Sequence, residues 1–187
     1  MTLAAVHITP DVADQLLADI RLATGLLSEL KGSRIDLIER ALFFRLFAKA
    51  GGKAIVGVAI SALKPAASDD LGSLDQLVYA ALLNDCIGAA LVQEGGCAAV
   101  VIDDGRYHAL ALDHIRSDIA FMIGPCGDAK LELSHRSAGL QIADVIANTF
   151  FNRALVTDRQ SQMAEMVAPF LENGTIKMRI LADHRLA

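Results

Sequence analysis

The sequence predicts an α/β fold in which helices cover the faces of a sheet, and three observations support this. Strand-like runs alternate with helical patterns along the chain, without an internal repeat or a low-complexity linker. Hydrophobic residues make up 53% of the sequence but aromatic residues only 5%, so we expect a core of small and aliphatic side chains. The length of 187 residues matches one domain, with residues 156–187 as a C-terminal helix and strand extension.

Five runs have the composition of β-strands. They occupy residues 2–8, 53–62, 97–102, 130–133 and 175–181. The run at 97–102 is continuously apolar and ends in Asp103-Asp104-Gly105, which predicts a strand buried on both faces.

Six segments have helical patterns, and capping residues mark several of their starts. They occupy residues 10–24, 37–50, 74–94, 107–117, 140–155 and 157–171. Thr9 is placed to be the N-cap of the first helix, with Pro10 at its first position. Pairs of residues three apart give capping signals at later starts: Ser33 with Asp36, Ser73 with Gln76, and Thr157 with Gln160. Gly25, Gly51-Gly52 and Gly95-Gly96 follow the first three helices as expected terminators.

Charge and hydropathy exclude several classes of protein. The net charge of −5 gives no global attraction to nucleic acid, although residues 29–53 are locally basic. No run approaches 18 apolar residues and the N-terminus lacks a signal-peptide pattern, so we expect a cytoplasmic protein without a membrane span. The large apolar fraction also predicts burial against another subunit, as in a homodimer.

Cysteines and histidines lack the spacing of a metal site. Cys86, Cys97 and Cys126 are odd in number and far apart, which predicts small buried side chains in a reducing compartment. No pair of the five histidines has the HxxxH or HxH spacing of a zinc site.

The helix at 140–155 carries a stripe of short polar side chains. Gln141, Asp144, Asn148 and Asn152 follow steps of three, four and four, so they line one helix face. The remaining positions are apolar nearly all round, which predicts a mostly buried helix. Because Lys, Glu and Arg usually fill solvated faces, this polar stripe favours metal ligation or contacts in a cleft. A simple solvated face is the alternative.

Three acidic residues have contexts that suit a site. Glu29 lies in a polar, glycine-containing loop, Asp103 ends a hydrophobic strand, and Asp144 belongs to the polar stripe. Carboxylates that converge from separate elements bind Mg²⁺ or Mn²⁺, because hard cations prefer oxygen ligands. Two such ions can activate a water and stabilise a leaving oxygen in phosphodiester cleavage. The alternative for Asp103 is a turn-forming residue without a functional role.

These residues resemble motifs of the bacterial and phage domain-of-unknown-function-3800 family. The resemblance rests on Val100-Val101-Ile102-Asp103, on Glu29-Leu30-Lys31-Gly32-Ser33, and on Ser137 followed by Leu140-Gln141-Ile142-Ala143-Asp144, and it spans about Leu3 to Leu155. It implies a ribonuclease H-like mixed sheet flanked by helices. It also implies a metal-dependent nuclease-type site, with Glu29, Asp103 and Asp144 at the acidic family positions. Ser137 matches the serine shortly before the helix.

The chain departs from that family at its beginning. Family members open with a strand bearing Asp-Glu-Ser before the run that corresponds here to Leu3–Ile8, whereas this chain starts with Met1-Thr2. In ribonuclease H-like sites the first-strand Asp bridges the metals and its strand is central. We therefore expect a sheet whose first strand is missing or replaced. Either the start was placed too late, or residues 175–181 of this chain or a partner fill the gap.

Together these observations predict a metal-dependent, nuclease-like phosphodiesterase with weakened or lost activity. Glu29, Asp103 and Asp144 would hold Mg²⁺ or Mn²⁺ and act in catalysis. The substrate-binding residues would be Lys31, Arg34, Ser137 and Gln141, with the two cations steering phosphate. One alternative is a non-catalytic, homodimeric binding or assembly module, and another is a different enzyme class such as a thiol hydrolase. A catalytic site requires clustered carboxylates with at least one raised pKa, whereas a module would have them scattered or paired with cations.

Overall fold

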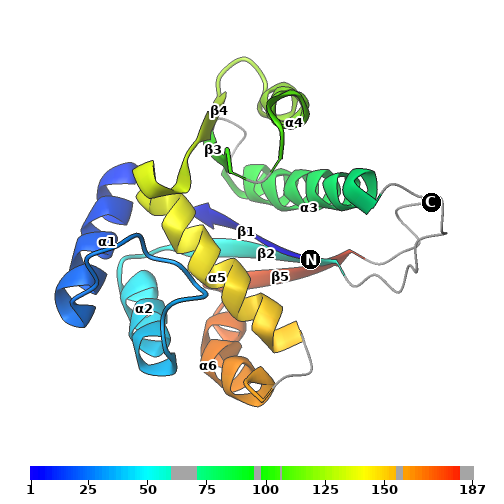
Figure 1. The fold of residues 1–187 in the computed structure, drawn as a ribbon. Helices are drawn as coiled ribbons and strands as arrows, with labels where there is room; N and C mark the ends of the chain where they lie inside the picture. Colours follow the sequence, from blue (N-terminus) through cyan, green and yellow to red (C-terminus); the bar gives the residue numbers. More distant parts are fainter. Residues whose placement is uncertain (60–70, 95–97, 106, 155–157, 182–187) are drawn as a thin grey trace.

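A computed structural model describes residues 1–59, 71–94, 98–105, 107–154 and 158–181, and it shows a mixed α/β fold (Figure 1). The larger sheet has the strand order β1-β2-β5, formed by β1 (Thr2–His7), β2 (Lys53–Ala59) and β5 (Ile176–Leu181). In this sheet β1 runs antiparallel to β2, and β5 runs parallel to it. A second, two-stranded parallel sheet is formed by β3 (Ala99–Asp103) and β4 (Asp128–Glu132).

Helices cover both faces of the larger sheet. The helices are α1 (Pro10–Thr24), α2 (Leu37–Lys49), α3 (Leu71–Glu94), α4 (Ala109–Ile123), α5 (Ala138–Ala154) and α6 (Gln160–Glu172), with a short 3₁₀ turn η1 (Ser134–Arg136) before α5. Alternate β2 side chains separate the two layers: Val56 packs with α1, α2, α5 and α6, whereas Ile55 packs with α3. On the α3 side, α4 and the β3–β4 sheet complete the second cluster (Figure 1).

Most predicted elements are confirmed, with shifts at their ends. The α2 helix starts from a capping box of Asp36 and Glu39, so the prediction of Ser33 with Asp36 was wrong by one turn. The α3 helix begins at Leu71, before the predicted Ser73 signal. Predictions for residues 60–62, Gly95-Gly96, Cys97 and Thr157 fall outside the described residues.

The prediction that the third strand is buried on both faces is wrong. Ala99 is exposed, and Val100 and Val101 are only partly buried. The reason is that β3 pairs with β4 alone among the described strands, so its other edge and part of its apolar surface stay open.

The C-terminal strand does not fill a gap in the sheet. β5 pairs with β2, with Ile176 opposite Ala54, and therefore lies at the edge of the sheet that is remote from β1. The hypothesis that residues 175–181 of this chain replace a missing central strand is therefore wrong. Instead, Ile176 of β5 and Val167 of α6 are almost fully buried in the main core, so the predicted C-terminal extension is part of that core.

The cysteines differ from one another. Cys86 is free and buried, as predicted, and burial raises the pKa of its thiol to about 12. Cys126 is exposed and disulfide-bonded, so the prediction of a reduced, buried thiol is wrong there. Cys126 lies in the turn between α4 and β4, where no apolar layer covers it. Cys97 lies outside the described residues.

Within the described residues, α3 is the helix long and apolar enough to cross a membrane, over Asp75–Val92. The core helix of a soluble protein passes the same test, and α3 packs against β1 and β2. Its hydropathy is therefore weak evidence for a membrane span.

Candidate functional site

The polar stripe of α5 lies against the loop at residues 26–36, which joins α1 to α2. Gln141 is buried: its Oε1 accepts a hydrogen bond from the Leu30 amide at 3.0 Å, and its Nε2 donates to the Ser134 carbonyl at 3.2 Å. Asp144 accepts a hydrogen bond from the Gly32 amide through Oδ2 at 2.7 Å. Much of the stripe therefore holds a loop of the same chain, which is neither of the two predicted roles, a ligand site or a solvated face.

A buried arginine completes this contact. Arg40 of α2 donates to Thr149 Oγ1 at 2.5 Å, to Asn148 Oδ1 at 3.1 Å and to the Gly32 carbonyl. Burial lowers the pKa of the Arg40 guanidinium, the nearby Arg159 lowers it further, and Asp144 opposes both. Arg40 thus ties the loop, α2 and α5 together. We call this cluster of Gly32, Arg40, Asn148 and Thr149 the arginine clamp.

The sequence analysis did not single out Arg40, although its pattern held a signal. Arg40, Phe43, Phe44 and Phe47 follow helical spacing and share one face of α2. All four side chains are buried. A cation on a phenylalanine-rich face needs polar partners inside the core, and that requirement could have pointed to Arg40.

Gly32 allows the loop to approach α5 closely. A Cβ at this position would lie 2.5 Å from the Asn148 Cβ and 2.9 Å from the Asp144 carbonyl oxygen. No larger residue fits without moving the loop or the helix. The glycine of the Glu29–Ser33 motif therefore has a packing role in setting where Glu29 and Lys31 lie.

Glu29 is held by two partners. Ser134 Oγ donates to Glu29 Oε1 at 2.5 Å, and Lys31 Nζ lies 3.2 Å from the same oxygen. The Ser134 hydrogen bond lowers the pKa of Glu29, burial opposes it, and Lys31 and His135 add to the lowering. Glu29 is therefore an anchored, ionised carboxylate at neutral pH. Ser134 was not predicted, because a serine in a short turn gives no distinctive sequence signal.

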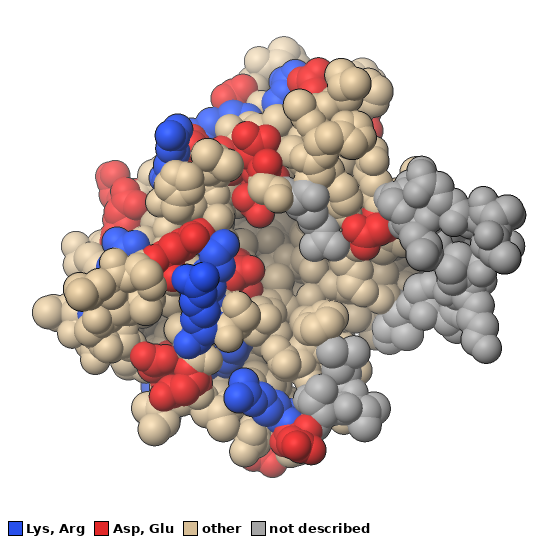
Figure 2. Space-filling model, in the orientation of Figure 1, with Lys and Arg blue, Asp and Glu red and all other residues tan. Residues whose placement is uncertain are grey.

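The pKa of Asp103 depends on the charges of both other predicted carboxylates. Burial raises its pKa most, the Gly105 amide and the Lys31 charge lower it, and the charges of Asp144 and Glu29 add smaller increases. These residues come from the 26–36 loop, the end of β3 and the second turn of α5. The fold thus brings Glu29, Asp103 and Asp144 within electrostatic range. On the face shown in Figure 2, acidic and basic side chains gather around a hollow near its middle.

The carboxylates are not arranged as a ready-made metal cage. No group of three or more His, Cys, Asp or Glu side chains in the described part of the chain is placed to hold a metal ion. Glu29 already pairs with Lys31, while Asp144 uses one oxygen for the Gly32 amide. The donor chemistry, oxygen from carboxylates, suits Mg²⁺ or Mn²⁺.

The other predicted residues have simpler roles or none in these contacts. Ser137 caps α5, because its Oγ accepts a hydrogen bond from the Leu140 amide at 3.3 Å. Arg34 is exposed in the loop, and Lys31 is half-buried beside Glu29. The raised pKa of Cys86 opposes the thiol hydrolase alternative, because a buried neutral thiol is a poor nucleophile.

Comparison with protein-family models, with curated proteins and with solved structures finds no match to this chain. The resemblance to the domain-of-unknown-function-3800 family therefore stays a prediction. The assignment of function rests on the geometry above.

Proposed function

We propose that this chain is a cytoplasmic, divalent-cation-dependent phosphodiesterase of ribonuclease H-like type, weakly active on nucleic acid. The observation that supports the proposal is that Glu29, Asp144 and Lys31, from two other segments of the chain, lie close enough to Asp103 to act on its pKa. Unrelated surface acids seldom gather around one half-buried position, because their mutual repulsion costs free energy.

Each residue would contribute a definable part of the chemistry. Asp103 and Asp144 supply carboxylate oxygens, and a bound Mg²⁺ or Mn²⁺ would polarise a phosphodiester there. The ion pair with Glu29 holds the Lys31 side chain beside the carboxylates, where its ammonium group can attract a phosphate. Arg34, exposed on the same loop, adds a second cation for the substrate backbone. Because Lys31 and Ser134 already engage Glu29, only Asp103 and Asp144 offer carboxylate oxygens to the cation, which is the reason to expect weak activity.

The test is calorimetric titration of Mn²⁺ into the wild type, Asp144→Asn and Asp103→Asn. The asparagine at 144 keeps an oxygen that can accept from the Gly32 amide, so the loop contact is preserved while the charge is lost. We expect a single cation to bind the wild type, and at least about 10-fold weaker binding in both variants, because affinity follows the ligand charge. Asp118→Asn, an exposed acid of α4, is the matched control and should change nothing.

The same titration decides the second candidate function, a non-catalytic binding or assembly module. That alternative is favoured by the Glu29–Lys31 ion pair and by the Asp144–Gly32 hydrogen bond, since both use the acids to hold the fold. No heat of binding up to millimolar Mn²⁺ would reject the phosphodiesterase and leave the module. If the cation binds, cleavage of labelled single-stranded and duplex DNA and RNA should follow it and disappear in Asp103→Asn.

A further inference from the structure

The last turn of α5 meets strand β5 through an arginine and a methionine. Arg153 of α5 donates a hydrogen bond from Nη1 to the Sδ atom of Met178 at 3.2 Å. Parallel pairing places Met178 beside Val56 of β2, so both side chains lie on the sheet face that packs with α5. A thioether sulfur is a weak acceptor, so this contact uses little of what a charged donor can provide.

The Arg153 guanidinium has no oxygen acceptor among the described residues. Its other contact is with the ring of Phe150, whose centroid lies 5.8 Å from Cζ. Its Nε atom is buried and makes no hydrogen bond within the described part of the chain. A guanidinium carries five N–H donors and bonds most strongly to oxygen acceptors. Arg153 therefore lies against the Met178 sulfur with donor capacity that the described chain leaves unused.

The sulfur of Met178 is within reach of a small oxidant. Met178 is 36% exposed and Met122 of α4 is 37% exposed, whereas Met163 is buried. Both exposed side chains can be oxidised to the sulfoxide. Among the described contacts, the Met178 sulfur has a guanidinium donor and the Met122 sulfur has none. The two residues thus form a pair in which exposure is matched and the cationic donor is not.

We propose that Met178 is a site of reversible oxidation by hydrogen peroxide, and that Arg153 holds the sulfoxide that forms. A lone pair of the sulfur attacks one peroxide oxygen, so that an S–O bond forms as the O–O bond breaks. The departing hydroxide takes the proton of the transferred hydroxyl and leaves as water. The sulfur is oxidised by two electrons and the peroxide is reduced. A methionine sulfoxide reductase would restore the thioether.

The product suits the guanidinium better than the thioether does. A sulfoxide oxygen carries a large partial negative charge, so it accepts strongly from a charged N–H donor. Oxidation usually disrupts the packing of a methionine, because a polar group replaces an apolar one. Met178 is partly exposed and already has the cation on its sulfur, so its oxidation should strengthen the contact between α5 and β5.

The test compares thermal unfolding of the full chain before and after mild peroxide treatment, with oxidation at each methionine measured by peptide mass spectrometry. Met122→Leu keeps Met178 as its most exposed methionine, and Met178→Leu keeps Met122. We expect oxidation to raise the Tm of Met122→Leu by about 2 °C or more, because a charge-assisted hydrogen bond is gained. The Tm of Met178→Leu should fall or stay unchanged. Treatment with the reductase should return the first variant to its starting Tm.

A substitution of Arg153 shows whether the guanidinium is the cause. Arg153→Leu in the Met122→Leu background removes the donor and keeps an apolar side chain beside Phe150. Oxidation of Met178 should then lower the Tm or leave it unchanged. Arg153→Lys keeps a cationic donor and should retain part of the rise. Circular dichroism of the reduced variants confirms that they fold, and having two substitutions keeps the test valid if one does not.

Three results would overturn the proposal. If Met178 stays reduced under conditions that oxidise Met122, its sulfur is not open to peroxide. A lower Tm after oxidation of Met178 would show that the guanidinium does not hold the product. A rise in Tm that persists in Arg153→Leu would assign the stabilisation to a different contact.

Discussion

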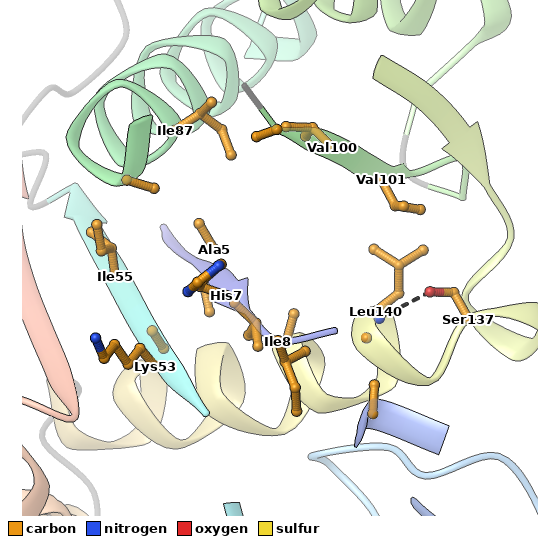
Figure 3. Close-up of a pocket in the computed structure, with 18 of the residues that line it drawn as sticks. Ala5, His7, Ile8, Lys53, Ile55, Ile87, Val100, Val101, Ser137 and Leu140 are labelled. Carbon is orange, nitrogen blue, oxygen red and sulfur yellow. Dashed lines mark hydrogen bonds between the residues drawn. The ribbon is translucent and has the colours of Figure 1, made fainter. Parts of the chain in front are cut away.

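Helix α5 joins two parts of the molecule in opposite ways. Along its polar stripe, the arginine clamp holds the 26–36 loop by hydrogen bonds from Arg40 to Thr149, Asn148 and Gly32. Near its start, Leu140 and Ala143 line the cavity between β1 and β3 (Figure 3). The first junction is polar and closed, and the second is apolar and open.

The difference follows from the cost of leaving each kind of group unsatisfied. A buried guanidinium without acceptors costs several kcal/mol, so the clamp is closed within the chain itself. Aliphatic side chains and sheet edges at a surface cavity cost less, since water can still reach the backbone groups. An open junction of this kind can therefore persist in the folded protein.

The acidic cluster spans both junctions. Glu29 and Asp144 are fixed by the loop contact, whereas Asp103 ends a strand that borders the cavity. The geometry of the acidic cluster therefore depends on both junctions, the closed polar one and the open apolar one.

The largest effect should come from breaking the clamp. Arg40→Met removes the donors to the Gly32 carbonyl and to Asn148, and leaves both acceptors in a buried site. We expect the free energy of unfolding to fall by about 3 kcal/mol, measured by urea denaturation. Arg45→Met, on an exposed position of the same helix, should change it by less than about 0.5 kcal/mol. A wild-type midpoint for Arg40→Met would show that the clamp does not hold the loop.

A smaller loss should follow from enlarging the closest approach of loop and helix. Gly32→Ala places a methyl group 2.5 Å from the Asn148 Cβ, so the loop must move away from α5. We expect a loss of about 1–3 kcal/mol in the same experiment, as for an overpacked core site.

Gly88→Ala is the matched control for this substitution. Its added Cβ would meet only the Met122 sulfur, at 3.7 Å, and alanine favours the α3 helix over glycine. We expect unchanged or slightly increased stability. An equal loss in both variants would mean that the close contact at Gly32 is not the cause.

The closed junction was only partly predictable from the sequence, and the open one was predictable in outline. Helical spacing placed Gln141 and Asp144 on one face, but it could not say that the Leu30 and Gly32 amides would meet them. Those contacts join residues more than one hundred positions apart, and no local pattern encodes such a pairing. The partners of Arg40 on α5 were unpredictable for the same reason, although its place on a phenylalanine-rich face indicated that it needs polar partners.

At the cavity, the local composition of β3 predicted more burial than the described fold provides. The apolar run ending at Asp103 predicted burial on both faces, and the structure leaves Val100 and Val101 half covered. The choice of residues 175–181 as the filling strand was wrong because pairing depends on where the chain returns. β5 follows α6 and reaches the edge of β2 instead.

The smallest predicted effect is a change in how stability depends on pH, and it has opposite signs for Asp103 and Glu29. Burial and the neighbouring carboxylates raise the pKa of Asp103, so its ionisation disfavours the folded state. This penalty is present above the folded-state pKa and absent below the unfolded value of about 3.9. Asp103→Asn should therefore raise the free energy of unfolding at pH 7, and the gain should shrink as pH falls through the folded-state pKa.

Glu29 has a lowered pKa through Ser134 and Lys31, so Glu29→Gln should lower stability at pH 7, with the deficit fading as pH falls through its own folded-state pKa. Urea denaturation of both variants from pH 3 to pH 7 checks the pair, and equal signs would contradict the division between an anchored Glu29 and a desolvated Asp103.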